Sequence, residues 1–490
     1  MGGPARIEPI CGHGPRGRCC AGVRRPPDSR PTRRTTVTPA AETRSTPRSS
    51  RILWLLLGAT VLGAALSVLA VQWCRVNGWI DPGQHVHMCY SDFSLLFTER
   101  GLADGRFPFV DDVPTDQVME YPVLIGVVAG LVSMLVPGTG EGHERVLAFY
   151  DLNHALVVLC WLGTVLATAF SAGRRRSDAL LVALAPGIIL TLSVNWDMWA
   201  VFLGALALLL WGRGRPVWAG VLIGLGAAMK LYPLFFFGAV LVLCLRAGRL
   251  RSAAATLVAA VVTWAAVNLP FMVTSFDQWA TFYRFSSERE VSFSSMWLAF
   301  GWLGLDGEGF SLLSNGLFLL CCLGVAYLAW AAPTRPRMAQ LCFLIVASFI
   351  LLGKVYSPQF VMWLIPLVVL ARPRVRAFVV WQAAEVFHWA AVWLMSAKIT
   401  SGGEIGAGHH LIEGAYGLGI VLHMAAVIYL MVQVVREILH PELDVVRSDA
   451  TSTPASPGTA YDPLAGVLAG RPDVVALPGL GLRTALHVRW

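Results

Sequence analysis

The feature that most constrains this chain is a near-continuous succession of apolar runs that extends from Tyr121 to about Arg436. An earlier run, Ile52 to Cys74, has about 23 residues, enough for a helix to span a hydrocarbon core of about 30 Å. Hydrophobic residues make up 56% of the chain and charged residues 14%, whereas soluble domains have about 45–50% and about 25%. The composition excludes an ordinary soluble globular protein and predicts an all-α, polytopic transmembrane helical bundle.

The formal net charge of +8 lies in the N-terminal tail, where residues 1–51 hold 11 Arg against three acidic residues. This excess sits in a Pro/Thr/Ser-rich stretch and not on a folded face, which argues against a nucleic-acid-binding domain. The first apolar run is longer than the core of a cleaved signal peptide. We therefore predict a disordered cytoplasmic tail over 1–51, a transmembrane domain over 52–436, and a cytoplasmic, mostly disordered tail over 437–490.

Arginine clusters occur in alternate connections between the apolar runs, and the positive-inside rule assigns such connections to the cytoplasm. The clusters are Arg174 to Arg176, Arg213 and Arg215, Arg246 to Arg251, Arg335 and Arg337, and Arg372 to Arg376. With both termini cytoplasmic, the rule predicts about 12 crossings if residues 121–137 form a juxtamembrane helix in the outer leaflet and not a full span. A thirteen-helix alternative would place the first cluster outside, which the rule disfavours.

Three hairpins have short arms, Asp178 to Trp211, Arg215 to Arg246 and Arg337 to Arg372. Each arm has about 15 residues, or roughly 22 Å of helix against a core of about 30 Å. Their polar tips should therefore lie below the outer surface, where charged groups normally face a wet cavity lined by protein. The alternative is that the bilayer thins and the tips are ordinary loops.

Lysine use points to the same side of the membrane. The chain has three lysines, Lys230, Lys354 and Lys398, and all lie at connections assigned to the outside. Lysine binds phosphate as a compact point charge, so a phosphate ligand at the outer leaflet would explain two of them at hairpin tips. The alternative is that outward lysines extend toward lipid headgroups.

The loop after the first helix contains Asp92, followed by an amphipathic stretch from Phe93 to Leu102 that predicts an interfacial helix. Asp92 either caps this helix or presents a carboxylate to the outer cavity. Glu120, at the start of the juxtamembrane segment, has the same two interpretations.

The histidines and cysteines predict no metal centre. His409, His410 and His423 have no carboxylate or cysteine at ligand spacing, and Glu385 with His388 is more often a buried hydrogen-bonded pair than half of a metal site. Five of the ten cysteines fall in apolar runs, and Cys74 with Cys89, near the first outside loop, is the one candidate pair for a disulfide in an oxidising compartment.

Five short motifs in order resemble the integral-membrane glycosyltransferases of GT-C type, in particular glycosyltransferase family 87 of actinobacteria. The motifs are Tyr90-Ser91-Asp92, Glu120-Tyr121-Pro122, Asn195-Trp196-Asp197, Lys230-Leu231-Tyr232-Pro233 and Lys354-Val355-Tyr356-Ser357-Pro358-Gln359. The best known members are polyprenyl-phosphate-mannose-dependent α-1,2-mannosyltransferases. The resemblance runs from about Arg51 to Arg436 and excludes both tails.

The resemblance implies a sugar transfer, with mannose the expected sugar, from a polyprenyl-phosphate donor to a lipid or polysaccharide acceptor at the outer face of the plasma membrane. The acid of the first outside loop, Asp92, would be the general base of an inverting reaction. Residues expected to bind the donor phosphate are Lys230, Tyr232, Lys354 and Tyr356. Further cavity candidates are Glu120, Tyr121, Asp151, His154, Asn195, Asp197 and Gln359. We assign no metal or other cofactor, although some related enzymes use a divalent metal.

The competing function is a transporter or flippase for a lipid or lipid-linked sugar, because short helices and buried charges are also typical of transporters. The two halves of the sequence show no inverted repeat, and the long first outside loop favours an enzyme. The partners expected on the enzyme hypothesis are the lipid-linked sugar donor, a glycolipid or glycan acceptor and membrane lipids, with no nucleic acid.

Overall fold

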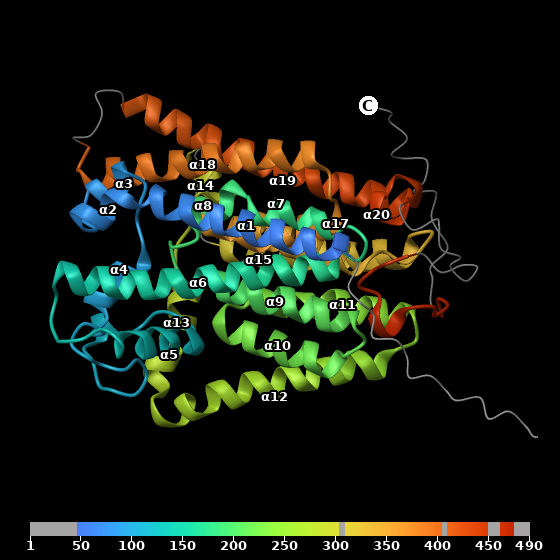
Figure 1. Cartoon of the computed structure of the whole chain (residues 1–490), viewed down its shortest axis with the longest axis horizontal. Coiled ribbons are helices and arrows are strands. Elements are labelled where there is room, and N and C mark those ends of the chain that lie inside the picture. Colours follow the sequence, from blue (N-terminus) through green and yellow to red (C-terminus); the bar gives the residue numbers. More distant parts are fainter. Residues whose placement is uncertain (1–46, 303–308, 404–408, 449–460, 475–490) are drawn as a thin grey trace, which may run out of the picture. The chain divides into compact units, whose positions relative to one another are not determined.

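A computed structural model describes residues 47–302, 309–403, 409–448 and 461–474, which belong to one compact unit that starts at Pro47 (Figure 1). Most of the predicted N-terminal tail, residues 1–46, lies outside the described residues, as do 449–460 and 475–490 of the C-terminal tail. The first helix starts at residue 47, four residues before the predicted end of the N-terminal tail.

Six helices within these ranges are long and apolar enough to cross a membrane. They are α1 (Pro47–Ala70), α6 (His143–Ser171), α12 (Leu250–Thr274), α15 (Phe310–Ala331), α18 (Val375–Thr400) and α19 (His409–Leu439). Extended structure in the described part of the chain is confined to β1 (Ser292–Phe293) and β2 (Val355–Tyr356), which pair in parallel. The predicted all-α, multi-pass membrane architecture is confirmed.

A second set of apolar helices has only 10–17 residues. It includes α5 (Val123–Ser133), α9 (Asp197–Gly212), α10 (Pro216–Met229), η3 with α11 (Tyr232–Phe235, Phe236–Arg246), α16 (Met338–Leu352), and η4 with α17 (Pro358–Phe360, Val361–Ala371). Every residue of α17 is buried, whereas only 17% of the apolar window of α12 is. Short helices whose ends stop inside a bilayer need protein around their unpaired backbone groups, and the burial of α17 satisfies that need.

One predicted hairpin arm, from Asp178 to Asn195, is not a continuous helix. The segment divides into η2 (Arg176–Ala179), α7 (Leu180–Ala183) and α8 (Pro186–Thr191). Pro186 disfavours helical geometry at the preceding residue, and Ala185 is extended, with ψ 116°. The amide oxygen of Gln382 accepts the hydrogen bond of the Gly187 N–H at 2.8 Å, which satisfies the backbone at the break.

Short helices gather at one end of the bundle, at the left in Figure 1. They are α2 (Gln72–Asn77), α3 (Gly83–Val86), α4 (Asp92–Glu99), α5 and α13 (Phe276–Glu288); η1 (Thr115–Gln117) lies between α4 and α5, and α14 (Met296–Trp302) follows α13. The predicted amphipathic helix corresponds to α4. The 11 residues of α5 would extend about 16 Å, less than the thickness of a hydrocarbon core, which agrees with a juxtamembrane helix.

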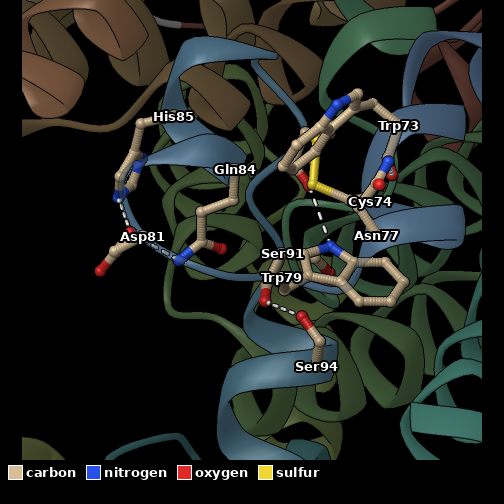
Figure 2. Close-up of a disulfide and its surroundings, with 10 residues drawn as sticks. Trp73, Cys74, Asn77, Trp79, Asp81, Gln84, His85, Ser91 and Ser94 are labelled. Carbon is tan, nitrogen blue, oxygen red and sulfur yellow. Dashed lines mark hydrogen bonds and ion pairs between the residues drawn. A yellow bond between two sulfur atoms is a disulfide. The ribbon is translucent and has the colours of Figure 1, made fainter. Parts of the chain in front are cut away.

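A disulfide joins α2 to the segment that leads into α4. Cys74 and Cys89 are bonded, with their Cα atoms 6.0 Å apart. Figure 2 shows Trp79 beside this bond, where its indole N–H donates to the backbone oxygen of Cys89 at 3.0 Å. The predicted pairing is therefore present, and it anchors the backbone directly before Tyr90 and Asp92.

The arginine-containing connections meet at the opposite end, next to η5 (Pro441–Leu443), α20 (Val445–Ser448) and η6 (Gly466–Leu468). Residues 461–474, which we call the C-terminal strap, contact several of these connections. The Asp473 carboxylate accepts hydrogen bonds from Arg246 at 2.8 Å and Arg335 at 2.5 Å. Leu464 of the strap is fully buried, so apolar packing adds to the ion pairs.

Candidate active site

The start of α4 fixes the position of Asp92. The N-cap is Ser91, whose hydroxyl accepts the hydrogen bond of the Phe93 N–H at 3.2 Å and donates to the backbone oxygen of Ser193 at 2.5 Å. The N–H of Asp92 itself donates to the backbone oxygen of Val194 at 2.7 Å. The interpretation of Asp92 as the helix cap is therefore wrong, because Ser91 satisfies the helix end and leaves the Asp92 carboxylate available for another purpose.

Two tyrosine hydroxyls hold the Asp92 carboxylate. Tyr90 donates to Oδ1 at 2.7 Å, and Tyr121 donates to Oδ2. Burial raises the pKa of Asp92, while these two hydrogen bonds and the nearby charge of Lys230 lower it. A raised pKa makes a carboxylate a stronger base as long as it stays ionised at the working pH.

A second polar group continues from Tyr121 to the tips of α9 and α10. The side-chain amide of Asn195 donates to the Tyr121 hydroxyl at 3.2 Å, and its oxygen accepts from the backbone N–H of Asp197 at 3.0 Å. The ammonium of Lys230 lies 3.1 Å from Oδ1 of the fully buried Asp197 and 4.6 Å from the centre of the Tyr121 ring. The structure thus brings together Asp92, Tyr121, Asn195, Asp197 and Lys230, which are far apart in the sequence.

Arg289, directly after α13, was not predicted as a site residue. Burial lowers the pKa of its guanidinium, and the negative charge of the nearby Asp92 carboxylate raises it. Its neighbours Glu288 and Glu290 give the segment the composition of a solvated loop, so the local sequence does not distinguish Arg289 from an ordinary surface residue. Its place in the long connection assigned to the outside was the one sequence feature that could have indicated a role at the outer cavity.

Lys354 approaches the same segment from the other hairpin. Its ammonium donates to the backbone oxygen of Ser287 at 3.1 Å, and its own backbone oxygen accepts from the Ser292 N–H at 3.1 Å. Arg289 lies between these two positions in the sequence. Lys398, the third lysine, lies 2.6 Å from a carboxylate oxygen of Glu413, in a separate pair.

The hydroxyls of two predicted donor-site residues, Tyr232 and Tyr356, bind other groups of the protein, and the predicted cavity residue Gln359 is buried. The Tyr232 hydroxyl donates to the backbone oxygen of Ala200 at 3.3 Å, and its ring stacks on Trp363 at 4.6 Å. The Tyr356 hydroxyl donates to Glu385 at 3.0 Å. Gln359 is buried, and its side-chain oxygen accepts no hydrogen bond from the described residues. Tyr232 and Tyr356 therefore anchor to the neighbouring helices the segments that directly follow Lys230 and Lys354.

The remaining acidic candidates are paired with arginines. Glu120 accepts two hydrogen bonds from Arg100, at 2.6 and 2.7 Å, and these raise the pKa of the guanidinium. Asp151 accepts two hydrogen bonds from Arg75. Both acids are thus engaged in ion pairs, which makes them weaker candidates for a general base than Asp92.

His154 lies on the same helix as Asp151, one turn further along. Its Nε2 lies 3.3 Å from the Ser67 hydroxyl, and its ring stacks on Tyr150 at 5.7 Å. Within the described ranges, no hydrogen bond or ion pair links His154 or Asp151 to Asp92. They belong to a separate polar group between α1, α2 and α6.

Comparison with known proteins gives one family match. Residues 120–353 match the model of glycosyltransferase family 87, a range that includes Tyr121, Asp197, Lys230 and Arg289 but begins after Asp92. No curated protein matches the chain. Among solved structures, ArnT from Cupriavidus metallidurans bound to undecaprenyl phosphate is similar with a TM-score of 0.42 and 15% identity, over 79% of this chain and 78% of that one.

Proposed function

We propose that this chain is a GT-C type membrane glycosyltransferase that transfers a sugar, mannose being the first candidate, from a polyprenyl-phosphate donor to a lipid or polysaccharide acceptor. The observation that carries the proposal is the Asp92 carboxylate, which is held by two tyrosine hydroxyls near the cations of Lys230 and Arg289. The family match over residues 120–353 supports the same reaction class.

The site contains the groups that a single displacement requires. Asp92 accepts the proton of the acceptor hydroxyl as that oxygen attacks the anomeric carbon of the donor. The bond from the anomeric carbon to the phosphate oxygen breaks, and polyprenyl phosphate leaves with the electron pair. Lys230 and Arg289 stabilise the charge that develops on the phosphate. One displacement from the face opposite to the phosphate inverts the anomeric configuration.

Two features support an active site on the outer side of the membrane. The disulfide between Cys74 and Cys89 lies directly before the Asp92 segment, and disulfides persist in oxidising compartments. The arginine-containing connections lie at the other end of the bundle, as the positive-inside rule expects of the cytoplasmic face. On this proposal both termini are cytoplasmic and the enzyme is located in the plasma membrane.

The decisive variant is Asp92→Asn, because Ser91 supplies the helix cap and the helix start does not depend on the Asp92 carboxylate. We expect transfer to fall by about 10²–10⁴-fold, the range a general base contributes, with donor binding retained. Purified protein would be assayed with a panel of polyprenyl-phosphate sugars and a membrane lipid extract as acceptor. Asp104→Asn, an exposed acid of the same loop, is the matched control.

Two outcomes would contradict the proposal. Transfer by Asp92→Asn at a rate close to that of the unchanged chain would remove Asp92 as the base. Movement of a lipid-linked sugar across a vesicle membrane, with no transfer from any donor, would favour the transporter hypothesis.

A further inference from the structure

Away from Asp92, α18 and α19 place three potential metal ligands together in the interior. Glu385, His388 and His423 each offer one ligand atom, and these atoms all lie within 4.8 Å of one another. Nδ1 of His388 lies 3.9 Å from one oxygen of Glu385, and Nδ1 of His423 lies 3.9 Å from the other. All three side chains are at most 3% exposed.

The close packing of the two helices creates this cluster. Glu385 and His388 are three residues apart and share a face of α18. On α19, Gly419 lies one turn before His423, and a Cβ atom at this glycine would lie 3.3 Å from Cα of His388. The missing side chain lets α19 approach α18, which brings His423 against Glu385. Sequence spacing alone gave no indication of this partner.

The histidines lack the hydrogen bonds that buried imidazoles normally make. Neither ring nitrogen of His388 has a hydrogen-bond partner among the described residues, and those of His423 make no well-aligned hydrogen bond there, although a backbone group of Ser294 lies within reach of the His423 ring. A neutral imidazole keeps one N–H donor and one lone pair, and leaving such groups unpaired in the interior is costly. The rings are 4.3 Å apart between centroids, so the lone pairs could serve a common ligand.

The carboxylate, in contrast, is oriented by donors and still has capacity. The Trp381 indole donates to one oxygen of Glu385 at 2.9 Å, and the Tyr356 hydroxyl donates to the other at 3.0 Å. Each carboxylate oxygen has two lone pairs, so each can accept a further bond. A ligand carboxylate that is itself hydrogen-bonded is typical of the surroundings of a metal site.

We propose that Glu385, His388 and His423 bind a transition-metal dication, and that zinc is the metal this ligand set suits best. Two imidazole nitrogens and one carboxylate are ordinary zinc ligands, and three protein ligands leave one position for a solvent molecule. Bonds of about 2.0–2.2 Å in tetrahedral geometry place ligand atoms about 3.4 Å apart. Two separations in the cluster are 3.9 Å and none exceeds 4.8 Å, so side-chain rotation would have to draw the three ligands closer together.

The metal would fix the hairpin that carries Lys354. Tyr356 packs its ring against His423 at 4.3 Å and against His388 at 5.3 Å, and its hydroxyl binds Glu385. Through β2 the same segment pairs with β1, close to Arg289. A metal at this place is therefore structural, holding together segments that contribute to the candidate active site.

The test measures metal and not activity. Full-length protein, purified with a peptide tag free of histidine and without chelators, is expected to hold one zinc ion per chain by mass spectrometry of its elements. After chelation, added Co²⁺ should produce the visible absorption bands of a four-coordinate site. His388→Gln, His423→Gln and Glu385→Gln should each lower the metal content at least tenfold.

His154→Gln is the matched control, because His154 is also buried in a membrane helix but is not part of this cluster. It should keep the metal. Absence of zinc from the unchanged protein together with no Co²⁺ binding would overturn the proposal, as would equal metal loss in the control. If a histidine variant fails to fold, Glu385→Gln decides, since the amide oxygen can accept from Trp381 and the amide NH2 can donate to the Tyr356 hydroxyl, whereas an amide binds zinc poorly.

Discussion

Removing the Tyr90 hydroxyl should shift the pH dependence of sugar transfer without displacing the side chain. The hydroxyl donates to Oδ1 of Asp92 at 2.7 Å and so favours the ionised carboxylate. In Tyr90→Phe the ring can keep its contacts with His85, at 5.4 Å, and Trp393, at 5.2 Å. The change therefore isolates one hydrogen bond to the proposed base.

The size of the shift follows from the strength of that bond. A hydrogen bond to a charged group contributes about 1.5–3 kcal/mol, and one pKa unit corresponds to about 1.36 kcal/mol. The pKa of Asp92, already raised by burial, should rise by about 1–2 further units in Tyr90→Phe. Because the base acts only when ionised, the acidic limb of the rate profile should move upward by the same amount.

Initial rates of sugar transfer at limiting donor concentration, from about pH 4 to pH 9, would report the free-enzyme pKa. Tyr327→Phe removes a hydroxyl from the exposed surface of α15 and serves as the control, with no expected shift. An acidic limb that stays in place in Tyr90→Phe would refute the argument. A uniform loss of rate at every pH would show that Tyr90 positions Asp92 but does not affect its ionisation.

Three other perturbations give distinct readouts. Lys230→Met should lower the free energy of unfolding by about 3–5 kcal/mol, because it leaves the buried carboxylate of Asp197 without its cation. Adding Asp197→Asn should restore the free energy of unfolding but not donor binding. Lys354→Met should weaken donor binding by roughly 10–150-fold, as loss of a charge-assisted phosphate contact predicts, and an unchanged donor affinity would exclude that contact. Cys74→Ser should lower the free energy of unfolding by about 3 kcal/mol, since the disulfide closes a loop with a sequence separation of 15, and a denaturant titration with the intact protein as reference would measure it.

The all-helical, multi-pass architecture was predictable because it depends on local composition. Apolar runs identified the long helices, and the alternating arginines correctly separated one end of the bundle from the other. The broken segment around Pro186 was missed because its composition is as apolar as that of a continuous helix. The helix break depends on a single proline, whose effect the hydropathy of the segment does not show.

The site residues were predictable only where the local sequence itself indicated a polar group on the outer side of the membrane. Lys230 was predicted from its hairpin tip, Asp92 from the first outside loop and Tyr121 from the family resemblance, and the structure brings the three together. Arg289 and the cluster around His423 depend on which helices pack against each other, which no local pattern records. The same limit explains why Glu120 stayed ambiguous until its partner Arg100 was located.

The C-terminal strap has a consequence for biosynthesis. Because ribosomes add residues from the N-terminus, Asp473 is made after every described helix of the bundle, so Arg246 and Arg335 lack their common carboxylate until residue 473 has been synthesised. The arginine-containing end therefore acquires its final packing last. A premature stop or a proteolytic cut before Asp473 would leave the described helices in place but remove the counter-ion of the buried Arg246. Quality-control proteases could detect this defect.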